Sequence, residues 1–386
     1  MGVLRKIFAY LLGLILIFLI VAARPQEHNT VPVPEEQEVQ TEATHSEEEG
    51  VFAPGEFIFD HIGDSYEWHI LSYNDFHLSI PLPVIVYSRE KGLNIFLFSK
   101  FHHGHSDYRG FRFEREGENR LKIVEIMDDG TTARPAFDVS FTKNAFAAFF
   151  TIVLMLWVFL SVTKAYNSRK GQAPKGLQNL VEPFIIFIRD EIALPSIGKH
   201  KYERFLPYLL TVFFFIWINN MMGLIPIFPG GANVTGNITI TAMLAGFTFF
   251  ITTLSGNRSY WQHIFNPPGV PWWLKFPIPL MPLIEFLGIL IKPCVLAVRL
   301  FANISAGHII ALGFFSLIFI FGQMQVGLGF VVSPLTLAFT IFMSMLELLV
   351  ALIQAYVFTL LSSLYFGMAT IEHHEHKENK ELKSEG

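Results

Sequence analysis

Residues 292–308 read KPCVLAVRLFANISAGH and lie within the first of two long apolar segments, at about 280–321 and 330–367. At 1.5 Å per residue, each segment would form a helix about 55 to 60 Å long, nearly twice the roughly 30 Å of a hydrocarbon core. Each helix must therefore tilt steeply in a bilayer or break. Folded against each other, the two segments predict a long helical hairpin near the C-terminal end of a membrane protein.

The composition of the whole chain also favours a membrane location. Of its 386 residues, 52% are hydrophobic and only 16% are charged, and the mean hydropathy is +0.42, which is too apolar for an ordinary soluble protein of this size. The net charge of -5 is small, and no basic cluster is long enough to grip phosphates, so we expect no nucleic-acid partner. Cys294 is the single cysteine, which excludes an intramolecular disulfide.

Three shorter apolar stretches precede the hairpin, at about 145–162, 205–227 and 238–254. With the two long segments they predict about five transmembrane helices. Between the first two, the apolar spacing over 177–192 predicts an amphipathic helix on the inner membrane surface. The proline-rich stretch 256–279 predicts a loop at the inner interface. The predicted fold is an all-α polytopic membrane protein with a long, steeply tilted C-terminal hairpin.

The chain divides into five predicted regions. Residues 1–23 have the charged start, apolar core and small-residue end of a signal peptide, or form an N-terminal anchor. Residues 24–50 predict a disordered acidic linker, and 51–140, with alternating runs such as Val84–Tyr87, a small β-rich extramembranous domain. Residues 141–370 form the membrane domain and 371–386 a polar tail. Because lysines and arginines at 164–175 follow the first span, the positive-inside rule places 51–140 in the periplasm and the tail in the cytoplasm.

Ionisable residues recur inside the hairpin at helical spacing. Glu285, Lys292 and Arg299 are seven residues apart and drift only about 20° per step, so they share one helix face, which Asn303 continues one turn later. The second helix repeats this pattern at Thr340, Glu347 and Gln354. A charge at the centre of a membrane helix costs roughly 2.5 to 3.5 kcal/mol, so such residues indicate function. The alternative is that they are paired polar residues that hold the hairpin together.

An antiparallel hairpin brings some of these residues to the same depth. With Arg299 level with Gln354, His308 lies about 13 Å further along and Glu347 about 10 Å in the same direction. Glu285 lies about 21 Å away on the other side. A guanidinium keeps its proton at any relevant pH and acts as a fixed charge. Carboxylates and imidazoles exchange protons with water. The polar path therefore has two halves, separated by one arginine.

The run 292–308 resembles the signature of the ATP synthase a subunit, which centres on Arg-Leu-Phe-(Gly/Ala)-Asn followed by Ala-Gly. The resemblance extends to Asn220–Pro226, to 233–242 and to Gln354, and covers about residues 145–370. It implies a membrane subunit of a bacterial F-type ATP synthase in the inner membrane. Such a subunit forms two offset proton half-channels against the c-ring and couples proton flow to rotation. Its partners would be the c-ring, the peripheral-stalk b subunits, the rest of the synthase and the lipid bilayer. It would carry no cofactor and, as a single chain, would not be an enzyme.

The resemblance also assigns roles by position. Arg299 matches the essential arginine that attracts the ring carboxylate, and Asn303 and Gln354 match its polar neighbours. His308 and Glu347 match two positions of the outer half-channel, where many bacterial members carry the acid and the imidazole the other way round. Glu285 matches an acid of the inner half-channel. The long extension before residue 140 departs from the compact bacterial pattern, and its sequence reveals no role.

Other functions fit less of the pattern. An ion-coupled secondary transporter should show internal repeats, and the early and late spans show none. An intramembrane serine protease could use Ser305 and His308, three residues apart, but the sequence offers no third orienting group. The histidines at 102, 103 and 105 lack an evident set of supporting ligands, and those at 373, 374 and 376 fit a solvated charged tail better than a metal site. We therefore expect no metal site.

Overall fold

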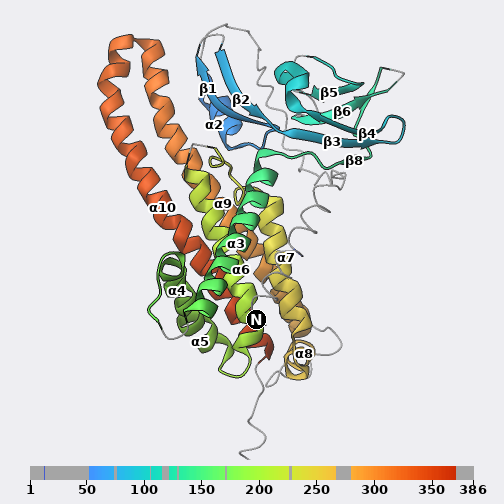
Figure 1. The fold of residues 1–386 in the computed structure, drawn as a ribbon, viewed down its shortest axis with the longest axis vertical. Helices are drawn as coiled ribbons and strands as arrows, with labels where there is room; N and C mark the ends of the chain where they lie inside the picture. The colour runs from blue at the N-terminus through green and yellow to red at the C-terminus, as the bar shows by residue number, and fades with distance from the viewer. Residues whose placement is uncertain are drawn as a thin grey trace, which may run out of the picture. The chain divides into compact units, whose positions relative to one another are not determined.

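The computed structural model describes residues 13, 52–73, 76–104, 106–114, 121–127, 130–169, 172–225, 228–266 and 280–370. Figure 1 shows their order in colour, from the short helix and strands in blue and cyan to the last long helix in red. The predicted signal peptide, apart from Gly13, and the predicted linker and tail lie outside the described residues. The described chain is mostly helical, with a small strand-containing N-terminal region, as predicted.

The N-terminal region contains one helix, a 3-10 turn and three small antiparallel sheets. The helix α2 is Pro54–Ile62 and the turn η1 is Phe98–Gly104. The sheets are β1 (Glu67–Tyr73) with β2 (Phe76–Pro81); β4 (Gly92–Leu97), β3 (Pro83–Ser88) and β8 (Phe137–Asp138); and β5 (Phe111–Glu114), β6 (Lys122–Ile126) and β7 (Thr132–Ala133). The core shared by the second and third sheets contains Tyr66, Val84, Val86, Phe96, Phe98, Phe101, Phe111 and Ile123.

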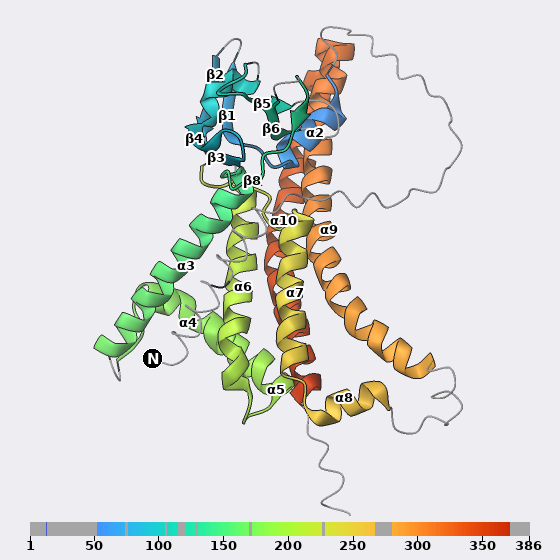
Figure 2. The same ribbon diagram turned by 90° about the vertical axis from the view of Figure 1, so that its right-hand side faces the viewer.

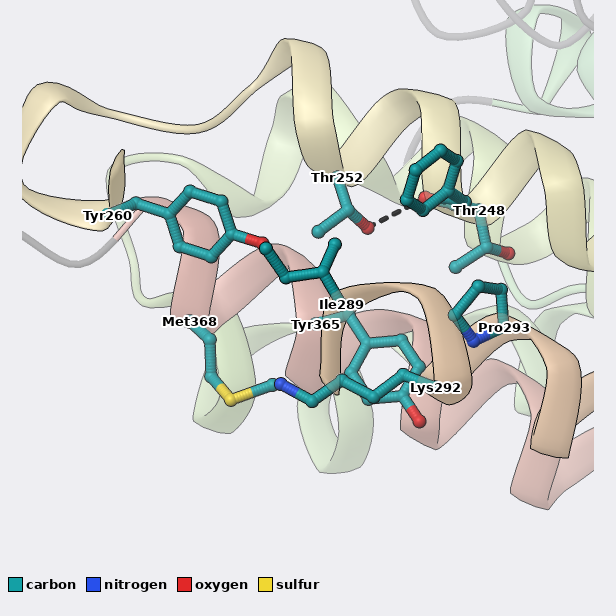
Figure 3. Close-up of a pocket in the computed structure, with 9 residues that line it drawn as sticks. Thr248, Thr252, Tyr260, Ile289, Lys292, Pro293, Tyr365 and Met368 are labelled. Carbon is teal, nitrogen blue, oxygen red and sulfur yellow. Dashed lines mark hydrogen bonds between the residues drawn. The ribbon is translucent and has the colours of Figure 1, made fainter. Parts of the chain in front are cut away.

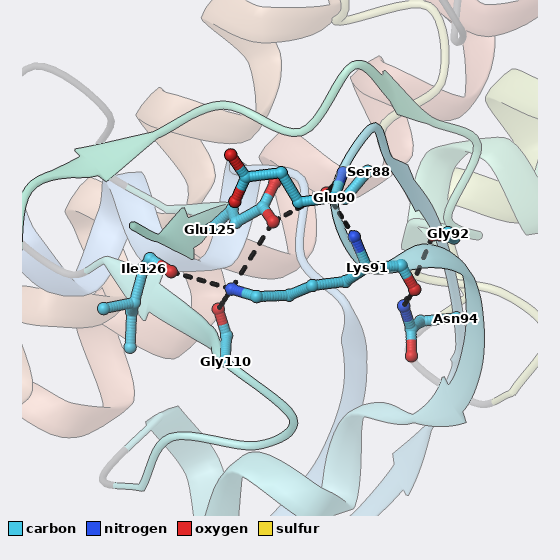
Figure 4. A network of polar contacts seen from close by, with 8 residues as sticks. All are labelled: Ser88, Glu90, Lys91, Gly92, Asn94, Gly110, Glu125 and Ile126. Carbon is cyan, nitrogen blue, oxygen red and sulfur yellow. Dashed lines mark hydrogen bonds and ion pairs between the residues drawn. The ribbon is translucent and has the colours of Figure 1, made fainter. Parts of the chain in front are cut away.

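A buried polar network joins the β3–β4 turn to β6 (Figure 4). The Lys91 ammonium lies 3.4 Å from a carboxylate oxygen of Glu125 and donates hydrogen bonds to the carbonyls of Gly110 and Ile126. The Ser88 hydroxyl donates to the same Glu125 carboxylate at 2.6 Å. Each buried charge thus has partners, which is the condition under which a buried ion pair is tolerated.

The strand region is joined to the first long helix, α3 (Lys143–Ser168), by backbone hydrogen bonds. The N–H groups of Lys143 and Asn144 donate to the Ser65 carbonyl at 2.8 Å and to the Asp64 carboxylate at 2.9 Å. A carboxylate that accepts N–H groups in the first turn satisfies donors that the helix itself leaves free. The helix start is therefore fixed to the strand region by these contacts.

Four described helices are long and apolar enough to cross a membrane, or five if α7 and the bent continuation α8 count as one span. They are α3, α6 (Tyr202–Leu224), α9 (Leu280–Met324) and α10 (Val326–Thr370), with α7 (Ile238–Leu254) and α8 (Arg258–Phe265) as the bent pair. α9 and α10 are continuous helices of 45 residues each, with only Gln325 between them. The sequence predicted that each long helix either tilts steeply in the bilayer or breaks. Neither helix is broken, and the steep tilt stays a prediction.

Two helical segments differ from the sequence predictions. The predicted surface helix at 177–192 is α4 (Leu177–Phe187), which continues as a π-helical segment, η2 (Ile188–Ala193), and a short α5 (Leu194–Ile197). Its Ile188 and Ile192 are buried, but Leu177 and Leu180 of the same predicted apolar face are exposed. The stretch predicted as an irregular loop begins with α8, a helix bent by 101° from α7. The prolines that argued against a helix all follow Asn266, outside the described residues.

Hydroxyl groups hold neighbouring spans together within the membrane region. Figure 2 shows α6 and α7 running side by side, and the Tyr208 hydroxyl lies 2.8 Å from that of Thr248 on α7. Thr248 in turn lies 3.2 Å from Ser362 on α10. Between α3 and α6, the Thr151 hydroxyl donates to the Asn219 side chain. Such interhelical hydrogen bonds are a main source of helix association in lipid, and they fix α10 against α7.

Candidate functional site

The predicted site residues lie on α9 and α10, and the structure brings two of them into contact. The Nδ1 atom of His308 lies 2.8 Å from the Oε1 atom of Glu347, with side-chain exposures of 17% and 5%. This is the proximity that the antiparallel arrangement predicts. The approach satisfies the distance of an ion pair but not the angle of a hydrogen bond, so Glu347 Oε1 has no hydrogen-bond partner among the described residues. A buried acceptor left in this state favours a proton or a water molecule.

Two glycines make room for this acid–imidazole pair. A Cβ atom on Gly307 would lie 3.0 Å from Glu347 Oε1 and 3.1 Å from its Cδ, closer than most real contacts. A Cβ atom on Gly223, near the end of α6, would lie 3.2 Å from the Ala232 carbonyl and 3.7 Å from the Nε2 atom of His308. The end of α6 and the loop after it therefore reach the far side of the imidazole.

Two further polar residues support α10, one on α6 and one in the loop after it. Asn220 is buried on α6 and donates a hydrogen bond to the carbonyl of Ala351, one turn after Glu347. The side-chain oxygen Oδ1 of Asn220 accepts a hydrogen bond from the hydroxyl of Thr235. Both side chains are buried and their groups are paired. They hold the backbone of α10 between Glu347 and Gln354, and Gln354 is itself buried.

Arg299 and Asn303 have different surroundings. Both are exposed in the single chain, whereas Leu296, Leu300 and Ile304 on the other side of α9 are buried. Next to the arginine, Val295 is 47% exposed and Val298 53%. An exposed guanidinium on a membrane helix needs an anionic or polar partner in the membrane.

A narrow cavity opens on the Glu285 side of Arg299 (Figure 3). The cavity volume is about 20 Å³, enough for about one water molecule. Side chains from α7, α8, α9 and α10 line it: Thr248, Phe249, Thr252, Tyr260, Ile289, Lys292, Pro293, Tyr365 and Met368. The Lys292 ammonium lies over the Tyr365 ring, 5.9 Å from its centre. Glu285 itself is half-buried and does not line this cavity.

The sequence pattern identified the ionisable residues but not the groups that position them. Asn220, Thr235, Gly223 and Gly307 had no role in the predictions, although the first three belong to the stretches that carry the resemblance and Gly307 lies in the quoted run. A buried asparagine in an apolar span was the available signal. The serine-protease alternative loses its central contact, because the Ser305 hydroxyl is buried without a hydrogen-bond partner among the described residues. Within the same residues, no group of three His, Cys, Asp or Glu side chains could hold a metal ion.

Comparisons with known proteins agree on one family for the helical part. The family model described as ATP synthase A chain matches residues 145–367, and a model described as a domain of unknown function matches residues 57–144. A protein from Chloroherpeton thalassium named ATP synthase subunit a is 39% identical over 276 residues, covering 70% of this chain and 76% of that protein. A second, from Chlorobaculum tepidum and named ATP synthase subunit a 2, is 41% identical over 276 residues, covering 70% and 72%. A third, from Pelodictyon phaeoclathratiforme, is 41% identical over 277 residues, covering 70% and 75%.

These matches cover more than half of the chain and most of each relative, and they include both helices that carry the site. They do not favour the transporter alternative. The chain belongs to the ATP synthase A chain family and is a multi-pass membrane subunit of the F0 sector, which serves proton transport and ATP synthesis.

Proposed function

We propose that this subunit forms two offset proton half-channels against a rotating ring of c subunits. The carrying observation is the contact between His308 and Glu347, buried within the hairpin and set on one side of the exposed Arg299. One proton-exchanging pair on one side of a permanent charge gives the asymmetry that rotation in one direction requires. Asn303 and Gln354 would provide polar contacts beside the arginine.

The outer half-channel would end at His308 and Glu347. An imidazole has two ring nitrogens, so it can accept a proton on one and release a proton from the other. Glu347 keeps one acceptor free of hydrogen bonds, so it can take a proton from the imidazole or from an incoming water molecule. A proton passed on to a ring carboxylate neutralises it. The neutral acid can then face lipid at low cost while the ring turns, whereas the ionised acid cannot.

Arg299 would act as the barrier and the release site. Its guanidinium stays charged and cannot relay a proton, and its exposure leaves it free to face a ring carboxylate. Attraction to the arginine stabilises the ionised carboxylate and so favours release of its proton. Direct passage between the half-channels is blocked, because every proton would have to cross a fixed positive charge.

The inner half-channel would receive the released proton near Glu285. The cavity beside Lys292 supports a route on this side of the arginine, since it has room for about one water molecule and Thr248, Thr252, Tyr260 and Tyr365 are among the residues that line it. Water and hydroxyl groups together can carry a proton over a short distance. Glu285, outside the cavity, would provide the exchangeable carboxylate toward the cytoplasm.

The positive charges after α3 support an orientation in a bacterial inner membrane. By the positive-inside rule, Lys164, Arg169 and Lys175 would lie on the cytoplasmic side. The strand region would then lie in the periplasm and the C-terminus in the cytoplasm. Besides the c-ring, the peripheral-stalk b subunits would bind this subunit and keep it from turning with the ring.

The test is proton movement in inverted membrane vesicles that contain the assembled synthase. Arg299→Ala should leave assembly intact, as measured by subunit content after purification, and should abolish ATP-driven proton pumping. Arg169→Ala is the matched control, because Arg169 is an exposed arginine just after α3 and lies outside both the hairpin and the cavity. It should pump at nearly the normal rate.

Passive proton uptake in the same vesicles completes the test. If Arg299 is the fixed-charge barrier, protons should cross directly between the half-channels in Arg299→Ala. Passive uptake should then continue even when the ring does not rotate. Retained pumping by Arg299→Ala would contradict the proposal at its central residue.

A further inference from the structure

One sheet of the N-terminal region has an apolar outer face as well as an apolar inner face. In the sheet β4–β3–β8, the inward side chains such as Val84, Val86 and Phe96 belong to the core. Antiparallel sheets with one solvated face normally carry polar residues outward. Here the outward residues are apolar, so this face differs from the surface of an ordinary soluble domain.

The strand register shows how complete this apolar face is. The outward cross-strand pairs are Pro83 with Leu97, Ile85 with Ile95, and Tyr87 with Leu93. Phe137 of β8 pairs with Tyr87 on the other side, and their ring centres lie 6.2 Å apart. These seven residues contain no charged or amide side chain. We call them the outer-sheet patch.

The outer-sheet patch is strongly exposed. Leu93, Ile95 and Leu97 on the edge strand β4 are 63%, 59% and 49% exposed, and Phe137 is 51% exposed. A contiguous group of apolar side chains with this exposure marks a surface that binds something apolar.

The same sheet is fixed close to the start of a membrane span. Phe137 precedes Lys143, the first residue of α3, by six residues, which reach about 20 Å at most. The chain between them is not a free linker, because the Phe141 N–H donates to the Pro83 carbonyl at 3.0 Å and the Lys143 N–H to the Ser65 carbonyl. Pro83, a member of the outer-sheet patch, is thus hydrogen-bonded to Phe141, which lies two residues before the start of α3.

We infer that the outer-sheet patch lies on the surface of the lipid bilayer and inserts its side chains among the headgroups and upper acyl chains. Two observations favour lipid over a protein partner. The patch continues along the chain into a helix that is itself in the membrane. Its two aromatic rings, Tyr87 and Phe137, are of the type that gathers at membrane interfaces.

This inference does not depend on the proton path. Because the patch has no charge, its binding to lipid should not require anionic headgroups and should change little with salt, unlike the binding of a basic surface.

The test places a reporter on the patch in the assembled synthase. Cys294→Ser removes the single natural cysteine, and either Ile95→Cys in the patch or Arg112→Cys on β5 introduces one new site. These two side chains are similarly exposed, at 59% and 50%, so Arg112 is the matched control. Each is labelled with an environment-sensitive fluorophore in vesicles of neutral phosphatidylcholine. Quenching is then measured with nitroxide-labelled lipid and with aqueous iodide.

The bilayer contact predicts opposite behaviour at the two sites. Lipid nitroxide should quench the Ile95 site at least about threefold more strongly than the Arg112 site, since interfacial side chains lie about 5 to 10 Å into the headgroup boundary. Iodide should quench mainly the Arg112 site. Equal access of iodide to both sites would overturn the inference. An Ile95 site shielded from both quenchers would also overturn it, because a protein would then cover the patch.

A second variant tests whether the patch, or the fluorophore by its own affinity for lipid, enters the bilayer. With the reporter at Leu97→Cys, an added Leu93→Glu places a charge on the same edge strand without disturbing the core. Quenching by lipid nitroxide should fall toward the level of the Arg112 site. Unchanged quenching would show that the fluorophore, and not the patch, enters the bilayer, and would also overturn the inference.

Discussion

Glu125 in the strand region and Glu347 in the membrane helices are both buried beside a basic side chain, but their surroundings differ. Glu125 accepts a hydrogen bond from Ser88, and its partner Lys91 is bound by two carbonyls. Glu347 lies 2.8 Å from His308, and the oxygen in that contact has no hydrogen bond among the described residues. One acid accepts a hydrogen bond at the oxygen of its ion pair, and the other has no hydrogen bond there.

The partner bases differ in the same sense. A lysine ammonium only donates hydrogen bonds, whereas a neutral imidazole donates from one ring nitrogen and accepts at the other. The pair with several hydrogen bonds joins two segments of the strand region. In the proposed function, the pair with an open acceptor passes a proton on. Counting hydrogen bonds thus compares the two pairs without reference to the family.

The largest expected effect is the loss of proton pumping on neutralising the functional acid. Glu347→Gln keeps the shape of the side chain but cannot exchange a proton, so ATP-driven pumping should fall by about 100-fold or more, the usual scale for a lost proton-transfer group. Pumping is measured in inverted vesicles at equal amounts of assembled complex. Glu125→Gln, the same change in the strand region, should leave pumping near normal. Equal losses in both variants would remove the distinction between the pairs.

The next effect is recovery when the acid and the base are exchanged. His308→Glu alone or Glu347→His alone leaves two like groups in contact and should lower pumping strongly. The double variant His308→Glu with Glu347→His restores one acid and one imidazole, so pumping should return to within about tenfold of normal. A double variant no better than the worse single variant would mean that the two residues act separately.

A smaller effect is expected from breaking the structural pair. Lys91→Met removes the ammonium and leaves Glu125 buried with Ser88 as its partner. Local opening of β6 should become easier by about 2 to 3 kcal/mol, toward the low end for a broken buried pair because Lys91 is partly exposed. Hydrogen exchange of residues 122–126 in the intact synthase measures this free energy. Pumping should be unaffected, and unchanged exchange would show that the pair contributes nothing to stability.

The smallest effect belongs to an exposed pair, Asp107 with Arg112. Hydrogen bonds from the Arg112 guanidinium lower the pKa of the Asp107 carboxyl. Its contribution to stability is therefore present above the unfolded pKa, near 3.9, and is lost as pH falls through the lower folded pKa. Asp107→Asn should remove this pH dependence, with a change near the limit of measurement because both groups are exposed.

Hydrogen exchange of residues 106–114 at pH 6, and again at pH values below about 4, measures the effect of Asp107→Asn. The difference between the variant and the natural chain should shrink as the pH falls. A difference that stays constant with pH would exclude the carboxyl as its source.

Periodicity and composition predicted the parts of the fold that depend on neighbours in sequence. The two long apolar segments became α9 and α10, and the alternating run Val84–Tyr87 fell within β3. Helix α8 was not predicted, because the prolines that follow it dominated the reading of that stretch. The proximity of His308 and Glu347 was predictable, since a straight antiparallel hairpin fixes the relative depth of its residues.

The supporting groups of the site were not predictable in the same way. Asn220 meets Ala351 across 131 residues of chain, and Thr235 bonds to Asn220. Helical spacing within one segment carries no information about such contacts. Gly307 and Gly223 matter through the space that they leave, which only the packed structure reveals. The exposure of Arg299 likewise depends on how α9 packs, although its charge could be read from the sequence.

The far end of α10 has a mechanical consequence for the site. The last carbonyls of the helix, at Ala369 and Thr370, accept hydrogen bonds from the backbone and side chain of Asn257 and from the ammonium of Lys201. A helix that slips by one residue moves 1.5 Å along its axis and turns by about 100°, which would carry Glu347 away from His308. The three bonds act about 35 Å from Glu347. They anchor the rotational setting of α10 against the sideways load that a turning ring would place on it.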